Sequence, residues 1–245
     1  MKNQVIAVDL GGTNLRVAIV DGIKIKRLIK RKTPKTNLSR EIIKEISKLM
    51  NSEIRGICMG TPGFFTGGGI INSPNLKINP MLPKEVEKKF GKKVFTENDA
   101  KCAALAELKL GYGKINRNFI ILTIGTGIGG GIVIDGKLYR GRGIAGEFSK
   151  IIFQDGKDFE FYSGVKGLKR FGRKKRGEYL GKGVAGLINI FDPEIVVLGG
   201  GAKKEPGLIE NIRKETQKYA VRKNTPIVWS KLNEPGLLGA SLLVK

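Results

Sequence analysis

The stretch IAVDLGGTNLRVAIVDG, residues 6–22, decides the fold because its pattern returns further along the chain. It aligns without a gap to residues 120–136, IILTIGTGIGGGIVIDG. Each copy has an apolar strand, a glycine-bearing turn, a second apolar strand and an Asp-Gly pair, which is a strong hairpin signal. An internal repeat of this kind predicts two structural units of one design.

The segments after each hairpin also correspond. Third strands are expected near residues 23–29 and 137–140, helices at 39–50 and 179–190, and strands at 54–59 and 195–198. Each half then ends with helix, strand, loop and helix: residues 84–90, 94–95 and 99–110 in the first, 207–219, 227–229 and 237–243 in the second. Hairpins joined to strand–helix crossovers give mixed sheets flanked by helices.

This organisation predicts an α/β protein of two duplicated mixed-sheet domains with a cleft between the lobes. We expect an N-terminal lobe at residues 1–111 and a C-terminal lobe at 112–245. The last helix, at about 236–245, could pack back on the N-terminal lobe.

The composition excludes several chemistries. The 245-residue chain contains no histidine, which rules out Ser-His and Cys-His relays and the usual Cys/His zinc sites. Cys58 and Cys102 lie in apolar runs and are interpreted as buried small hydrophobes. No run of about 18 apolar residues and no signal-type stretch occurs, so we expect a cytoplasmic protein without a membrane partner.

The net charge of +23 makes polyanions candidate partners. Lys and Arg concentrate at residues 24–35 and 166–176, whereas the glycine-rich segments are nearly free of charge. Such basic stretches usually form solvated faces, so nucleic acid is not expected to be the main partner. A continuous basic stripe on the surface would favour nucleic-acid binding.

The two glycine turns are predicted to bind phosphate. Turns that present several backbone N–H groups to one point attract anions, and glycine lets the oxygens approach. The first turn offers Gly11, Gly12, Thr13 and Asn14, and the second offers Gly125, Thr126 and Gly127. Asp9 adds a carboxylate suited to Mg²⁺. Neither turn matches a P-loop or a dinucleotide fingerprint, because each joins two strands.

A third glycine turn, Gly199, Gly200 and Gly201, follows a strongly apolar strand. There a flat ring can lie against the backbone, which suggests an adenosine site and hence ATP with Mg²⁺ as cofactors. The alternative is a simple strand-ending turn.

The chain resembles the ROK sugar kinases, a family with the two-lobed actin-like ATPase (ribonuclease H-like) fold. The resemblance rests on motifs in family order over nearly the whole chain: Asp9–Asn14, Gly60–Gly63, Ser73–Leu76, Glu97–Ala100, Thr123–Gly131, Gly146-Glu147 and Leu198–Gly201. It implies that Asp99 takes the proton from the attacking sugar hydroxyl. It also implies that Asn75, Asn98 and Glu147 hold other hydroxyls, with Gly63 among the substrate-binding residues. Without a catalytic role, Asp99 would be a helix N-cap.

The chain departs from the family at its metal site. Family kinases place a zinc-binding histidine after the Gly-Glu pair and then a cysteine cluster, whereas this chain has Lys150 and no cysteine beyond Cys102. We therefore expect no structural zinc. Lys150 could signal an altered acceptor or simply point to solvent. Glu160 could match a further sugar-binding glutamate, although it lies one residue too close to Ser163-Gly164.

The resemblance implies an ATP-dependent kinase for a hexose, most simply glucose at its 6-hydroxyl. Some short family members without the cysteine cluster use polyphosphate, and the basic stretch at 166–176 keeps that donor open. An amino or N-acetylated hexose is another open acceptor. The non-enzyme alternatives are a sugar- or nucleotide-binding regulator and an actin-like structural protein. Family repressors carry an N-terminal helix-turn-helix, and this chain starts directly with the phosphate strand. Family members are commonly dimers, so a homodimer stays open.

Overall fold

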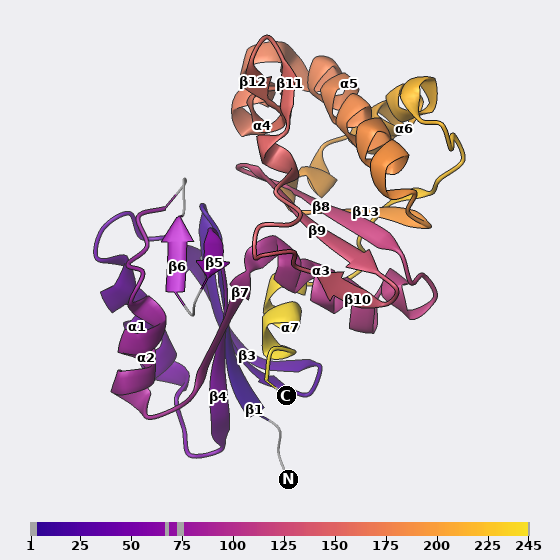
Figure 1. Ribbon diagram of the computed structural model, residues 1–245. Coiled ribbons are helices and arrows are strands. Elements are labelled where there is room, and N and C mark those ends of the chain that lie inside the picture. The colour runs from indigo at the N-terminus through magenta and orange to yellow at the C-terminus, as the bar shows by residue number, and fades with distance from the viewer. Residues whose placement is uncertain (1–3, 67–68, 73–75, 245) are drawn as a thin grey trace. The chain divides into compact units, whose positions relative to one another are not determined.

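The chain folds into two compact units. The computed structural model describes residues 4–66, 69–72 and 76–244 (Figure 1). Unit 1 comprises Met1–Ala106, Gly141–Ile144 and Leu232–Lys245, and unit 2 comprises Glu107–Arg140 and Ala145–Lys231. The first segment of unit 1 ends at Ala106, before the expected boundary at residue 111. Glu107, which is buried, already belongs to unit 2. Its carboxylate accepts hydrogen bonds from the Tyr112 backbone nitrogen and the Ser230 hydroxyl.

The sheet of unit 1 has five strands in the order β3-β2-β1-β4-β7. These strands are β1 (Gln4–Leu10), β2 (Asn14–Asp21), β3 (Lys24–Lys32), β4 (Ile54–Thr61) and β7 (Val94–Asn98). β1, β2 and β3 pair antiparallel, whereas β1, β4 and β7 pair parallel. The sheet is therefore mixed, with the glycine turn of β1 and β2 at the end of a central strand.

Helices cover both faces of this sheet (Figure 1). α1 (Leu38–Leu49) and α2 (Leu82–Phe90) bury apolar side chains against one face. On that side Ile42 and Ile46 are fully buried together with Val8 and Val17 of the strands. The other face receives α7 (Pro235–Ser241), which contacts β1, β2 and β4. The C-terminal segment is thus part of the unit that contains the first glycine turn.

The sheet of unit 2 repeats this design with the order β10-β9-β8-β13-β14. Its strands are β8 (Phe119–Ile124), β9 (Ile128–Ile134), β10 (Lys137–Tyr139), β13 (Ile195–Gly199) and β14 (Ile227–Trp229). The first three pair antiparallel, and β8, β13 and β14 pair parallel. The predicted duplication and the mixed sheets are confirmed, because the two copies of the repeat occupy equivalent places.

Two helices, α5 (Val165–Phe191) and α6 (Leu208–Tyr219), pack together on one face of this sheet (Figure 1). Leu180, Val184 and Ile212 are fully buried in that core. The helix predicted at residues 207–219 corresponds to α6, whereas within α5 the sequence predicted only the stretch at residues 179–190. α5 begins earlier because its basic run consists largely of good helix formers, and Gly172, at φ 78°, makes the kink inside it.

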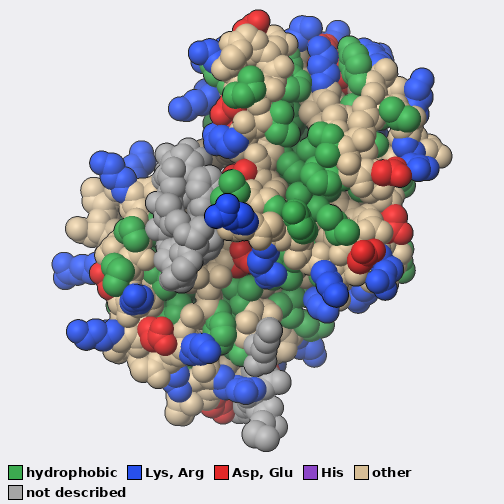
Figure 2. Space-filling model, in the orientation of Figure 1, with side chains coloured by type: hydrophobic (Ala, Val, Ile, Leu, Met, Phe, Trp, Pro, Cys, Tyr) green, Lys and Arg blue, Asp and Glu red, His purple; other side chains and the backbone are tan. Residues whose placement is uncertain are grey.

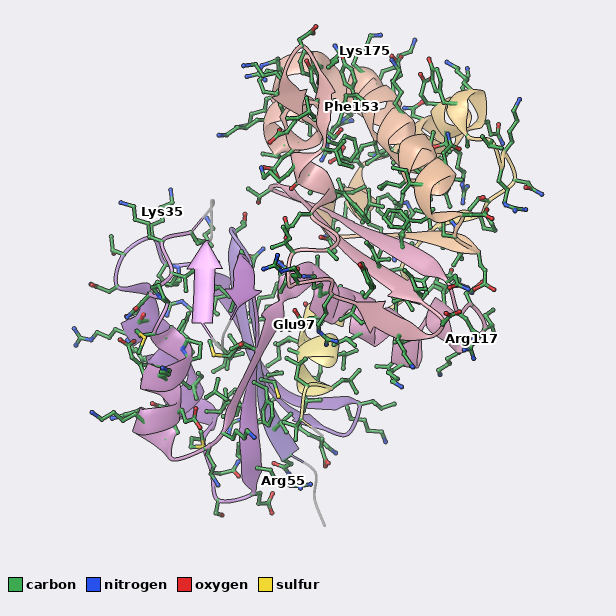
Figure 3. All side chains as sticks on the ribbon, viewed as in Figure 1. Lys35, Arg55, Glu97, Arg117, Phe153 and Lys175 are labelled. Carbon is green, nitrogen blue, oxygen red and sulfur yellow. The ribbon has the colours of Figure 1, made fainter. Side chains whose placement is uncertain are left out.

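Several short elements were not predicted. They are the hairpin of β5 (Phe64–Thr66) and β6 (Gly69–Asn72), the hairpin of β11 (Ile152–Gln154) and β12 (Lys157–Asp158), the helix α4 (Phe159–Ser163), and the 3₁₀ turns η1 (Tyr112–Lys114), η2 (Phe148–Lys150) and η3 (Gly201–Lys204). Tertiary packing stabilises the second hairpin: Phe153 contacts the rings of Phe159, Tyr162 and Tyr179 (Figure 3). Elements of two to five residues carry too little periodicity to be predicted.

One hairpin turn lies one residue later than predicted. The second hairpin turns at Asp135-Gly136, where both residues have positive φ. In the first hairpin Asp21 is still paired with Lys24, so the turn residues are Gly22 and Ile23. Of these two, only Gly22 has positive φ, and the side chain of Ile23 is 58% exposed. The Asp-Gly pair therefore marks the turn without fixing its register.

The cysteines agree with the sequence interpretation. Cys58 and Cys102 are free and completely buried. Burial raises the pKa of the Cys58 thiol to about 12 and also raises the pKa of Cys102, so both stay protonated at neutral pH.

Among the described residues, none of the helices has the length and apolar character needed to cross a membrane.

Candidate active site

The first glycine turn joins β1 to β2 in unit 1. Its backbone closes through the Gly11 nitrogen and the Asn14 oxygen, 2.9 Å apart. Gly12 and Thr13 lie at its exposed tip. Thr33 holds the turn from β3: its hydroxyl donates to the Gly11 oxygen at 2.6 Å, and its nitrogen donates to the Thr13 oxygen at 2.9 Å. Sequence reasoning missed Thr33, because nothing local links a threonine 20 residues away to the turn.

Asp9 lies at the carboxyl end of β1, directly before this turn. The residue is 9% exposed, and its Oδ2 accepts a hydrogen bond from Arg16 Nη1 at 2.9 Å. Burial raises the pKa of the Asp9 carboxyl, and the Arg16 charge opposes that shift. The hairpin register pairs Asp9 directly with Arg16 across β1 and β2. That register is a signal the sequence contained, since residues equally far from the turn face each other.

The donor set around Asp9 fits Mg²⁺ in one particular mode. Within the described residues, no group of three or more His, Cys, Asp or Glu side chains could hold a metal ion. Asp9 therefore offers a single carboxylate, with one oxygen engaged by Arg16. Mg²⁺ is commonly held by one or two carboxylates together with substrate phosphates and water. The residues present fit an ion that arrives with a nucleotide, and they do not fit a resident metal cluster.

Asn98 and Asp99 lie where β7 ends and α3 (Asp99–Leu110) begins. The Asn98 Oδ1 accepts hydrogen bonds from the nitrogens of Ala100 and Lys101 at 3.0 and 3.2 Å. Asn98 is therefore the N-cap, the role considered for Asp99. Asp99 is the first helical residue, and its Oδ1 lies 2.9 Å from the Ala100 nitrogen. Capping by Asn98 fixes the backbone from which the Asp99 carboxylate projects.

The Asn98 amide also reaches the β4 side of the site. Its Nδ2 donates to the Gly63 oxygen at 3.3 Å. An amide nitrogen has two N–H donors, so one is left to contact a ligand. Gly63 has φ 110°, a backbone conformation that favours glycine. The structure thus places Asn98 close to Gly63, through this hydrogen bond, and next to Asp99 in the chain. The predicted Asn75 lies outside the described residues.

The second glycine turn joins β8 to β9 in unit 2. The Gly125 nitrogen donates to the Gly127 oxygen at 2.9 Å, and Thr126 is exposed at the tip. A Cβ at Gly125 would meet nothing within 4 Å, so the protein leaves open space there. The Thr126 oxygen accepts from the Val165 nitrogen at 3.3 Å, which ties the turn to the start of α5.

Glycines beside this turn permit close backbone packing. Gly200, at φ 89°, packs against β8 so closely that a Cβ would lie 2.8 Å from the Ile124 nitrogen. A Cβ at Gly146 would lie 2.7 Å from the Gly130 oxygen. That contact sets the backbone immediately before Glu147, which is partly buried. Gly199 and Gly201 have no such neighbour: a Cβ would meet nothing within 3.8 Å at Gly199 and nothing within 4 Å at Gly201.

Lys150 and Glu160 form an ionic cluster in unit 2. Lys150 Nζ lies 3.1 Å from Asp158 Oδ2 and 3.7 Å from Glu160 Oε1. Although partial burial opposes it, the hydrogen bond to Asp158 and the nearby carboxylates raise the pKa of Lys150. The other Glu160 oxygen accepts from the Ile128 nitrogen at 2.9 Å, where β9 begins. The cluster therefore supports the second glycine turn, and Asp158 is a member that sequence reasoning missed.

Comparisons with known proteins cover nearly the whole chain. The ROK family model matches residues 5–163 and 171–245. A glucokinase of Thermotoga maritima is 30% identical over 311 aligned positions, covering 100% of this chain and 98% of that protein. The crystal structure of a ROK glucokinase from Streptomyces griseus, in complex with glucose and AMPPNP, is similar with a TM-score of 0.87 and 26% identity, covering 98% of both chains.

A third relative concerns the phosphoryl donor. The crystal structure of an inorganic polyphosphate/ATP-glucomannokinase from Arthrobacter sp. is similar with a TM-score of 0.79 and 26% identity, covering 98% of this chain and 97% of that chain. These likenesses confirm the expected two-lobed α/β fold.

Proposed function

The chain belongs to the ROK family, and we propose that this phosphotransferase moves the terminal phosphoryl group of ATP to the 6-hydroxyl of a hexose, most simply glucose. The observation that carries the proposal is the geometry at the start of α3. There Asn98 caps the helix, and Asp99 stands as its first residue. The likeness to the glucokinase of Thermotoga maritima and to the glucokinase–glucose complex supports glucose as the acceptor. The AMPPNP bound in that complex supports ATP as the donor.

In this proposal Asp99 is the general base. Its carboxylate takes the proton of the sugar hydroxyl as that oxygen attacks the terminal phosphorus, and the nucleoside diphosphate leaves. The free N–H of Asn98 donates to a neighbouring sugar hydroxyl, and the Glu147 carboxylate accepts from another. Groups that read hydroxyls discriminate strongly, because a substrate without the hydroxyl leaves a buried partner unpaired.

The two glycine turns hold the nucleotide phosphates. Their backbone N–H groups carry partial positive charge without a side chain in the way. Asp9 holds the Mg²⁺ that accompanies the phosphates, and this ion supplies neutralisation of the charge that develops during transfer. The turn of Gly199, Gly200 and Gly201 is assigned to the adenosine, and open space for the ring lies at Gly201, since Gly199 is buried.

Lys150 does not favour an acidic acceptor. Two carboxylates neutralise its ammonium group, so it offers little net charge to a substrate. This supports a neutral hexose over one that carries an acidic group. We assign Lys150 and Glu160 the role of supporting the second glycine turn. They would affect the sugar only indirectly, through that turn.

The test is a panel of acceptors and donors. Purified protein is assayed for sugar-dependent ADP release with glucose, mannose, fructose, glucosamine and N-acetylglucosamine, and parallel reactions with polyphosphate are scored for sugar phosphate. We expect turnover with glucose and Mg-ATP. If folded protein gives no sugar phosphate with any pair, the kinase proposal is wrong and a regulatory role gains support.

A second candidate donor is polyphosphate, because of the surface of α5. Six cations of this helix are exposed, and Lys175 pairs with Glu178. The other five form no ion pair with a described residue: Lys166, Lys169, Arg170, Arg173 and Lys174. Figure 2 shows Lys and Arg side chains over this part of unit 2, and Lys175 projects outward in Figure 3. The glucomannokinase that uses polyphosphate and ATP supports this alternative. Sugar phosphate from polyphosphate at a rate equal to that from ATP would establish it.

A further inference from the structure

Four side chains of alternating charge form a chain of ion pairs in unit 1. Asp9 Oδ2 lies 2.9 Å from Arg16 Nη1, and Arg16 Nε lies 2.7 Å from Glu234 Oε2. Lys30 Nζ continues the chain at 3.4 Å from Glu234 Oε1. Asp9 is the next-to-last residue of β1, Arg16 and Lys30 come from β2 and β3, and Glu234 directly precedes α7. The chain of ion pairs thus joins the C-terminal segment to the first glycine turn.

Arg16 is the central member, because it contacts two carboxylates at once. Its Nη1 donates a hydrogen bond to Asp9, whereas Nε, although 2.7 Å from Glu234 Oε2, has no hydrogen-bond partner among the described residues, so the contact with Glu234 is one of charge. Two nitrogens of one rigid guanidinium thus lie against two carboxylates, which the single nitrogen of a lysine cannot reproduce. The side chains of Arg16 and Glu234 are each 22% exposed, and that of Asp9 is 12% exposed. Pairs shielded to this extent are screened less by water and salt than surface pairs are. Glu234 therefore restrains the guanidinium that in turn restrains Asp9.

The backbone at Glu234 is strained. Glu234 has φ 50° and ψ 52°, the left-handed conformation that a residue with a Cβ rarely adopts. Such a conformation is unfavourable and persists only where the surroundings enforce it. Here the ion pair with Arg16 and the start of α7 both fix the residue. The strained backbone is a second observation, besides the ion pairs, which indicates that the Glu234 carboxylate is held in a fixed place.

Gly236 approaches Asp9 closely. A Cβ at this position would lie 2.7 Å from Asp9 Cγ and 2.8 Å from Asp9 Oδ1. Any side chain at residue 236 would therefore displace the carboxylate or the helix. Gly236 does not have positive φ, so the close approach, and not its backbone conformation, is what requires glycine.

We propose that Arg16, Glu234 and Gly236 are positioning residues that set the place of the Asp9 carboxylate for the Mg²⁺-bound nucleotide. The C-terminal segment from residue 232 is then part of the donor site, and α7 is more than a structural cover for the sheet. This inference rests on the proposed function, because it assigns Asp9 to the metal that accompanies the phosphates.

The test measures ADP affinity by calorimetry, with and without Mg²⁺ and without sugar. In Glu234→Gln, which keeps the shape and removes the charge, we expect the gain in ADP affinity that Mg²⁺ provides to fall at least fivefold. ADP affinity without Mg²⁺ and the KM for sugar should stay within twofold of wild type. A merely structural role would instead change all three quantities together. Glu210→Gln on the exposed surface of α6 is the matched acid-to-amide control and should leave all three unchanged.

A second variant separates positioning from simple loss of charge. Arg16→Met should reduce the Mg²⁺-dependent gain at least as much, and the double variant with Glu234→Gln should be no worse than Arg16→Met alone, because both act through one guanidinium. Arg16→Lys should not restore the gain, since an ammonium cannot bridge both carboxylates.

The outcomes distinguish the two proposals. If the folded Glu234→Gln variant keeps the full Mg²⁺-dependent gain, the positioning inference is overturned even when the wild type phosphorylates sugar. The inference is also overturned if wild-type protein shows no such gain. Wild type that gains affinity from Mg²⁺ and loses it in the variant, yet phosphorylates no sugar, would overturn the kinase proposal alone.

Discussion

The two glycine turns occupy equivalent places in the two sheets, but the protein supports them by different means. In unit 1 the turn follows a carboxylate that is held by ion pairs between Asp9, Arg16 and Glu234. In unit 2 the turn itself is uncharged, and close glycine contacts at Gly130, Gly146 and Gly200 surround it. The same fold therefore supports a glycine turn in two ways, with ion pairs beside the turn of unit 1 and close backbone packing beside the turn of unit 2.

The largest expected effect is at Asp99 of unit 1, the proposed base. Asp99→Asn should lower kcat by about 10²–10⁴-fold, the usual contribution of a positioned general base. Sugar affinity should be largely spared, because the amide keeps the shape of the side chain. A coupled assay measures kcat, and calorimetry measures sugar binding. Asp135→Asn, in the exposed hairpin turn of unit 2, is the control. Near-normal turnover of Asp99→Asn would remove Asp99 from the role.

A second prediction concerns the buried ion pair of unit 2. Arg176 is 1% exposed, donates through Nε to the Ser163 oxygen and pairs through Nη1 with Glu205. Arg176→Met should lower the free energy of unfolding by about 3 kcal/mol, the low end for a broken buried pair, because the Glu205 side chain stays 20% exposed. Urea denaturation measures it.

The matched comparison for Arg176 is Arg31 in unit 1. Arg31 pairs with Glu41 and Glu45, and its side chain is 37% exposed. Water reaches the Arg31 guanidinium, and the 1% exposed Glu45 keeps a second cation, Lys48, at 2.7 Å, so Arg31→Met should destabilise the protein less than Arg176→Met does. Equal losses would show that burial is not what distinguishes the two pairs.

The third prediction tests the steric support of the second turn. Gly200→Ala should cost about 1–3 kcal/mol, because Gly200 has φ 89° and no room for a Cβ. Gly201→Ala should leave stability unchanged and weaken nucleotide binding, since residue 201 faces open space beside the proposed adenosine. Thermal unfolding and ADP titration separate the two effects. If both variants were equally stable, the close packing of Gly200 would not be required.

The smallest expected effect concerns a buried cation beside the base. Lys101 is 2% exposed, and its ammonium donates to the Gly143 oxygen, three residues before Gly146. Lys101→Met should raise the KM for sugar about tenfold, because a hydrogen bond from a charged group contributes about 1.5–3 kcal/mol. Lys109→Met, on the exposed side of the same helix, is the matched control. Unchanged sugar KM would assign Lys101 to stability alone.

The sequence predicted the elements that periodicity and repetition determine. The helix at residues 99–110 and the strand at 227–229 have the predicted bounds, and the duplicated hairpins pair as expected. The sequence also predicted that Gly63, Asn98 and Asp99 share one site, and the structure places Asn98 within hydrogen-bond distance of Gly63 and next to Asp99. Their role in binding sugar stays a prediction. Asn98, and not Asp99, is the helix cap, because either residue type can cap and only the backbone decides which one does.

What the sequence did not predict are contacts between distant residues. Glu234 meets Arg16 only because α7 returns to the first sheet, and no local pattern marks that pairing. From the sequence, Gly200 was interpreted as part of an open turn and Gly146 as part of a family motif. In the structure, Gly200 packs closely against the backbone of Ile124, and Gly146 against that of Gly130. Asp158 joined Lys150 and Glu160 through a hairpin too short to show a period.

The most direct test of the central claim is to incubate wild-type protein with Mg-ATP and glucose and to identify the product by phosphorus NMR. We expect one sugar phosphate, glucose phosphorylated at the 6-hydroxyl, formed in a one-to-one ratio with ADP and formed about 10²–10⁴-fold more slowly when Asp99→Asn replaces the wild type. Folded protein that binds Mg-ATP but forms no sugar phosphate, or an Asp99→Asn variant that forms it at the wild-type rate, would contradict the account.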